Sequence, residues 1–202
     1  EIFTLTHDYD LFLTHDYKVF GLIHKDRIDM IEPAEIWDKL LLEYIEGKRK
    51  KPVWIIGTPH YTAEAGNMDS VETIFFVKND REKDVLDALR EGRAYVRFNL
   101  GGEPVNLDEF SAKDASNGLI KIIIKGSKAP FDTPLKLELI RNGKSFKRFE
   151  ETRNEWEIVL EDKLATKGKR AYYRLMISSP SSIILSNPVF VEETVEISQP
   201  IQ

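Results

Sequence analysis

The hydrophobic pattern changes character at Gly101-Gly102, and this change most constrains how the chain can fold. After it, short apolar runs are separated by turn residues and no helical period interrupts them. Within 135–141, leucines alternate with charged residues, which places the leucines on one face of a strand. Asn142-Gly143 is a strong hairpin signal because both central positions of a type I′ turn need positive φ. We expect an Ig-like β-sandwich over 107–193, with strands at 120–125, 135–141, 145–149, 156–160, 171–178 and 189–191.

The first half of the chain follows a different pattern. Apolar residues from Trp37 to Ile45 recur at helical spacing after Pro33, and Gly47 supplies a stop, so a helix with one buried face is expected. The run 53–56 is apolar on both faces, which favours a buried parallel strand that ends in Gly57-Thr58-Pro59-His60.

A second strand, helix and strand follow in the same half. The expected strand at 73–77 leads into a helix opened by a capping box of Asn79 and Glu82, Gly92 ends that helix, and 94–98 forms the return strand. Strand-helix-strand order is typical of α/β architecture. We therefore expect an α/β domain over 1–100, a boundary within 99–115, the β-sandwich over 107–193, and a polar tail over 194–202.

Composition excludes several classes of protein. The 202 residues carry a net charge of -5 with both signs interspersed, so nucleic acid binding is not indicated. No apolar run approaches the roughly 20 residues that cross a bilayer, so no membrane association is expected. The chain has no Cys, which excludes disulfides and thiolate metal sites and leaves the cellular compartment undetermined.

A tandem octapeptide concentrates candidate metal ligands near the start of the chain. The pattern Leu-Thr-His-Asp-Tyr-x-x-Phe occurs at 5–12 and again at 13–20, and it places His7 beside Asp8 and His15 beside Asp16. Imidazole and carboxylate groups are ligands for Zn, Mn and Fe, although an Asp beside a His is also common in turns. His60 is the further candidate ligand because it lies in a loop after a buried strand. His24, the remaining His, is interpreted as an ordinary surface or strand residue.

A resemblance to a known family is carried by 37–41, 54–60 and 84–96 in the first half of the chain and by 141–144, 172–175 and 186–189 in the second. In these segments the chain resembles the closing third of a PHP-type metal-dependent phosphoesterase domain, most closely of the CehA/McbA group, followed by the β-sandwich that often accompanies it.

The resemblance implies a β/α barrel, present here only in part, that holds divalent metal ions and hydrolyses a small phosphoester or a related bond. His60, and His7 with Asp8, are the residues that match the family's metal motifs. A partial barrel leaves sheet edges uncovered, which favours self-association.

The chain departs from the family pattern in ways that support a second hypothesis. It has no His-x-His pair. Thr6-His7-Asp8 lacks the Asp that family members carry between Thr and His, and 57–60 lacks the Asp of the family's closing motif. The alternative is therefore a non-catalytic PHP-type module whose sandwich serves binding or assembly.

Overall fold

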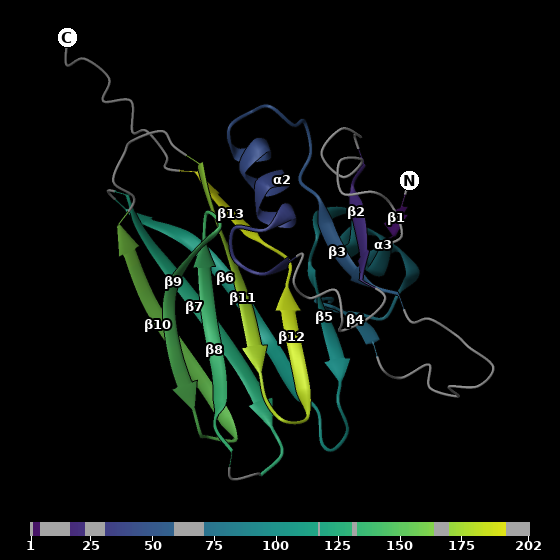
Figure 1. The fold of residues 1–202 in the computed structure, drawn as a ribbon, viewed down its shortest axis with the longest axis vertical. Helices are drawn as coiled ribbons and strands as arrows, with labels where there is room; N and C mark the ends of the chain where they lie inside the picture. The colour runs from purple at the N-terminus through teal and green to yellow at the C-terminus, as the bar shows by residue number, and fades with distance from the viewer. Residues whose placement is uncertain are drawn as a thin grey trace.

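The computed structural model describes residues 2–4, 17–22, 31–58, 71–116, 118–130, 133–163 and 170–192. These residues form a central antiparallel sheet and a layer on each of its two faces (Figure 1). Its strands are, in spatial order, β4 (Val71–Phe75), β5 (Ala94–Asn99), β12 (Ser182–Ser186), β11 (Arg170–Ser178), β8 (Leu135–Arg141) and β9 (Lys144–Glu151), with β13 (Val189–Glu192) also paired to β11.

One face of the central sheet packs against a second antiparallel sheet. This sheet has the order β10 (Glu155–Lys163), β7 (Leu119–Lys128) and β6 (Val105–Ser116). Apolar side chains from both sheets fill the space between them, including Ile122, Leu137, Trp156 and Leu175. They form the larger of the two hydrophobic cores in the described residues.

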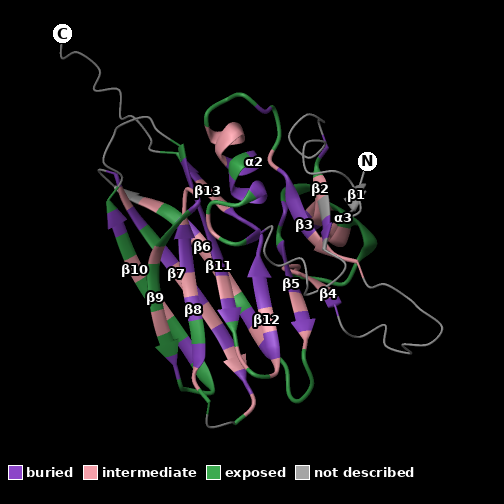
Figure 2. Cartoon of the chain, viewed as in Figure 1, coloured by how far each residue is buried: buried purple, intermediate pink, exposed green. Residues whose placement is uncertain are grey.

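The other face of the central sheet is covered by helix α2 (Ile36–Ile45) and by a parallel sheet of β1 (Ile2–Thr4), β2 (Val19–Leu22) and β3 (Trp54–Gly57). A second core forms there, in which Trp37 and Leu41 of α2 and Ile55 of β3 pack with Phe98 and Tyr172 of the central sheet. The middle strands β11 and β12 are therefore mostly buried on both faces (Figure 2).

The helices agree in position with the sequence patterns, although one start signal differs. Helix α2 buries Ile36, Trp37, Leu40 and Leu41 as its period predicts. Helix α3 (Glu82–Glu91) has Arg81 as its N-cap, with no side-chain capping bond, so the expected Asn79–Glu82 capping box is wrong. Neither helix, nor any other in the described segments, has the length and apolar character that crossing a membrane requires.

Two turns depend on the residues that the sequence places there. The β8–β9 hairpin turns at Asn142 and Gly143, whose φ angles are 49° and 76°, so the type I′ prediction is confirmed. Gly92 ends α3 at a φ of 68°, and a Cβ at this position would lie 2.3 Å from the ring of Trp54. Any other residue at Gly92 would therefore clash with the indole.

The expected α/β fold with a partial β/α barrel is wrong. Parallel pairing in the described chain is confined to β1, β2 and β3, whereas β4 and β5 pair antiparallel with each other, and β5 pairs antiparallel with β12. The physical reason is that a strand apolar on both faces needs cover on both faces, and the two cores of an antiparallel sheet supply that cover as well as a barrel does. The β4–α3–β5 order therefore did not indicate strand direction.

Strand β6 occupies most of the segment in which a boundary was expected. Leu107 and Ala112 of β6 are buried in the core between the two antiparallel sheets. A bulge between Leu107 and Glu109 shifts the register against β7, so the apolar residues of β6 lose their period of two. This loss of period explains why the pattern was not recognised as a strand.

Acid pH should weaken the fold through Glu151 at the end of β9. The Arg153 guanidinium, at 2.6 and 2.9 Å, and the backbone N–H groups of Thr152 and Arg153 hold its pKa at about 2, below the ordinary value of 4.5. A lowered pKa stabilises the fold above pH 4.5, and this stabilisation is lost as the pH falls from 4.5 towards 2. Urea unfolding at several pH values should show Glu151→Gln less stable than the parent at pH 6 and equally stable near pH 2. A difference that stays constant over this range would contradict the assignment.

Candidate functional site

The carboxyl ends of three parallel strands lie side by side at one edge of the small sheet. In the pairing register, Thr4 of β1 lies opposite Gly21 of β2, and Gly21 and Leu22 lie opposite Ile56 and Gly57 of β3. All three strands run in the same direction, so the residues that follow them in the sequence begin at the same edge (Figure 1). In sheets of parallel strands this edge is where ligands commonly bind.

Strand β4 fixes the end of β3 at this edge. The N–H of Gly57 donates to the Thr73 hydroxyl at 2.8 Å, and that hydroxyl donates to the carbonyl of Gly57 at 3.2 Å. A Cβ at position 57 would lie 2.7 Å from Cγ1 of Val71 and 2.9 Å from the carbonyl oxygen of Glu72. Glycine is therefore required here because the backbones of β3 and β4 approach closely.

Thr58, the first residue after β3, carries an unsatisfied polar group. Its hydroxyl is buried and has no hydrogen-bond partner among the residues that the structure describes. Buried hydroxyls are normally paired, and an exception needs an explanation such as a bound ion, water or ligand. The Thr58 hydroxyl is therefore a group that a bound polar ligand could satisfy.

The metal ligands expected from sequence, His7, Asp8, His15, Asp16 and His60, lie outside the described residues. Their sequence positions relative to the strands can still be compared. His7 follows Thr4 by three residues and His60 follows Gly57 by three, whereas His15 and Asp16 come directly before Tyr17 and the amino end of β2. The two copies of the octapeptide thus flank opposite ends of neighbouring strands.

His24 follows the carboxyl end of β2 at a spacing one residue shorter than that of His7 after β1 and His60 after β3. It follows Leu22 by two residues, and it also lies outside the described residues. Within the described segments no group of three or more His, Asp or Glu side chains is placed to hold a metal ion. The described residues therefore provide the scaffold of the edge rather than a ligand set.

A buried ion pair joins α2 to the central sheet, and sequence reasoning missed it. Nε and Nη2 of Arg174 donate to the two carboxylate oxygens of Asp38 at 2.8 and 2.7 Å, and both side chains are fully buried. The Tyr172 hydroxyl donates to Asp38 at 2.7 Å, and the N–H of Ala34 donates to it at 2.9 Å. The Arg174 guanidinium lies 5.0 Å from the ring centroid of Trp37. Burial and the Asp38 carboxylate raise the pKa of Tyr172 above its ordinary value, so the phenol stays protonated as a donor.

This cluster is structural in character. Each oxygen of the Asp38 carboxylate accepts two hydrogen bonds from the protein, which leaves no open position for a substrate. A signal for it exists in the sequence, because Arg174 is the one charged residue inside the apolar run 171–177. A charge inside a buried strand requires a paired partner.

A second link fixes the parallel sheet to the central sheet. The side-chain amide of Asn187 accepts from the N–H of Ile55 at 2.8 Å and donates to the carbonyl of Ile55 at 3.1 Å. The N–H of Asn187 donates to the carbonyl of Ala94 on β5. One residue thus holds β3 beside β5 and sets the position of the carboxyl edge.

Comparison of the chain with protein-family models, curated proteins and solved structures finds no significant match.

Proposed function

We propose that this chain is a metal-dependent hydrolase of the PHP type that acts on phosphoesters or a related bond. One observation carries the proposal: β1, β2 and β3 end side by side, and each is followed in the sequence by a His within three residues, namely His7, His24 and His60. A three-residue connection spans at most about 11 Å, which is compatible with three imidazoles sharing one metal ion.

The donor chemistry at this edge fits a divalent metal. His7, His24 and His60 offer imidazole nitrogens. Asp8, directly after His7, and Asp26, two residues after His24, offer carboxylates. These are the ligand types that Zn, Mn and Fe accept. The unpaired buried hydroxyl of Thr58, at the carboxyl end of β3, supports a polar ligand near the same place.

The roles of the chain's own residues follow from these positions. His7, His24 and His60 would hold the metal, and Thr73 and Gly57 keep the edge rigid through their two hydrogen bonds. The Thr58 hydroxyl is available to donate to a substrate oxygen. A bound metal would supply Lewis acidity and an activated water.

His15 and Asp16 are not part of the proposed ligand set. They precede the amino end of β2 in the sequence, at the opposite end of the strand from Leu22. The duplicated octapeptide therefore contributes one His to the site rather than two.

The second candidate function is a non-catalytic metal-binding module. It is favoured by the absence of a His-x-His pair, by the absence of the family's Asp between Thr6 and His7, and by the absence of an Asp from 57–60. Fewer carboxylates give less negative charge to hold several cations together. Hydrolysis of the PHP type requires a complete metal site, because the bound metal activates the attacking water.

Turnover separates the two candidates. After reconstitution with Zn or Mn, we expect the chain to hydrolyse an aryl phosphate and to lose this activity on chelation. His60→Ala should lower kcat/KM by at least about 100-fold, because a residue bound directly to the metal contributes more than the 10–100-fold typical of residues that only hydrogen-bond to its ligands. A thermal melt of His60→Ala that matches the parent excludes unfolding as the cause. Metal binding without chelator-sensitive turnover would favour the non-catalytic module, and turnover unaffected by chelation would contradict both.

A further inference from the structure

A pocket of about 460 Å³ lies at the amino end of β3, the opposite end from Gly57. Its volume lies in the range of small-molecule sites. It is formed where β3, the end of α3, the start of β5, β6 and the start of β13 meet, and its lining includes the aromatic side chains Trp54, Phe76, Phe110 and Phe190.

The walls of this pocket, which we call the aromatic pocket, are fixed by contacts within the protein. The Trp54 indole N–H donates to the carbonyl of Arg90 at 3.2 Å, and the ring packs against Gly92, where a Cβ would clash with it. Trp54 and Phe190 meet edge to face with ring centroids 5.9 Å apart. Nη1 of Arg93 donates to the carbonyl of Phe76 at 2.7 Å. The rings of Trp54 and Phe190 are therefore held in place before any ligand binds, which lowers the entropic cost of binding.

The charges lining the aromatic pocket leave one carboxylate uncompensated. Glu91 is paired with Arg93 at 2.6 Å, and Glu109 is paired with Lys125 at 3.2 Å. Asp108 is exposed and has no ion-pair or hydrogen-bond partner within the described part of the chain. The β6 bulge leaves Asp108 out of the register between Leu107 and Glu109. Bulges commonly redirect a side chain in this way.

We propose that the aromatic pocket binds a small organic cation with an apolar body, such as an aryl-alkyl ammonium. The faces of aromatic rings attract cations through their quadrupole, and the Asp108 carboxylate adds a full negative charge beside them. The apolar body of the ligand would be buried among the rings, and its ammonium would lie beside Asp108. The inference does not depend on the proposed hydrolase function. The aromatic pocket lies at the amino end of β3, whereas the proposed metal site lies at its carboxyl end.

Three probes that share a phenyl ring and differ in terminal charge test the proposal on the full chain. Phenethylammonium, 2-phenylethanol and phenylacetate are titrated while amide chemical shifts of Gly92, Arg93 and Val189 are followed by NMR. We expect phenethylammonium to bind about fivefold or more tightly than 2-phenylethanol, because it adds cation–π and ion-pair terms to the same apolar contact. Phenylacetate should bind most weakly.

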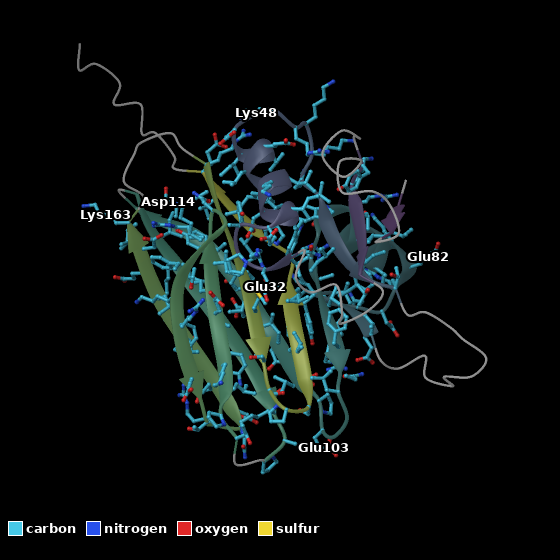
Figure 3. The ribbon with its side chains drawn as sticks, in the orientation of Figure 1. Glu32, Lys48, Glu82, Glu103, Asp114 and Lys163 are labelled. Atoms are coloured by element: carbon cyan, nitrogen blue, oxygen red, sulfur yellow. The ribbon has the colours of Figure 1, made fainter. Side chains whose placement is uncertain are left out.

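Two variants with the same change in net charge show whether Asp108 is responsible. Asp108→Asn should reduce the preference for phenethylammonium over 2-phenylethanol to less than about twofold. Glu103→Gln should leave it unchanged. Glu103 is exposed in the turn that follows the end of β5 (Figure 3), whereas the aromatic pocket is lined by Ala94 at the start of β5. Equal binding of the three probes, absence of shifts at Gly92, Arg93 and Val189, or a preference that survives Asp108→Asn would overturn the proposal.

Discussion

Replacement of Asp38 by alanine should lower the free energy of unfolding by about 3–5 kcal/mol, because it leaves the guanidinium of Arg174 charged in a core without its partner. Both side chains are fully buried, and two hydrogen bonds of 2.7 and 2.8 Å join them. The change would also leave the Tyr172 hydroxyl and the N–H of Ala34 without their acceptor. Urea unfolding followed by circular dichroism measures the difference.

A surface pair on α3 gives the matched control for Asp38. Asp87 and Arg90 also join a helical Asp to an Arg, at 3.1 Å, but the Arg90 side chain is 71% exposed. Asp87→Ala should therefore cost about 0.5 kcal/mol or less. The double variant Asp38→Leu with Arg174→Met removes both charges and should recover much of the loss. A loss in Asp38→Ala no greater than in Asp87→Ala would show that the ion pair does not hold α2 on the sheet.

Replacement of Asn187 by alanine should cost about 2–4 kcal/mol, since each buried backbone group left without a partner costs about 1–3 kcal/mol. The N–H and carbonyl of Ile55 both bond to this amide in a buried position, at 2.8 and 3.1 Å. The loss should appear first as faster hydrogen exchange in β3, because Asn187 joins this strand to the central sheet. The same denaturant experiment with exchange measured by NMR tests both effects.

Asn154 supplies the control for Asn187. It is exposed in the turn between β9 and β10, so Asn154→Ala should change stability by no more than about 0.5 kcal/mol. Unchanged exchange of Ile55 in Asn187→Ala would contradict the role of Asn187 as the link between β3 and the central sheet.

Local patterns predicted those elements whose conformation is decided by neighbouring residues. The period of α2, the alternation in β8 and the turn at Asn142-Gly143 follow from side-chain direction and positive φ, which are properties of a few consecutive residues. Gly92 belongs to this group because a left-handed C-cap favours glycine.

Features that depend on distant contacts were not predictable in the same way. The direction of β5 is decided by its pairing with β12, more than 80 residues further along the chain, and the apolar pattern of β5 is the same for either direction. The Asp38–Arg174 pair joins residues 136 positions apart, so only the unusual charge in β11 hinted at it. The pattern of His residues became interpretable only when the parallel register of β1, β2 and β3 showed which ends of the strands coincide.

The central functional claim is that residues following the carboxyl ends of β1, β2 and β3 hold a metal ion. The duplicated octapeptide offers a direct test of it. His7 and His15 have identical neighbours from Leu to Tyr, yet His7 follows the carboxyl end of β1 and His15 precedes the amino end of β2. The measurement is the metal content per chain after incubation with excess Zn or Mn and removal of free ions. We expect His7→Ala to lower the occupancy well below that of the parent, because a lost ligand weakens a metal site, and His15→Ala to match the parent. Equal occupancies in the two variants, or less than about 0.1 metal ion per chain in the parent, would contradict a metal site at this edge.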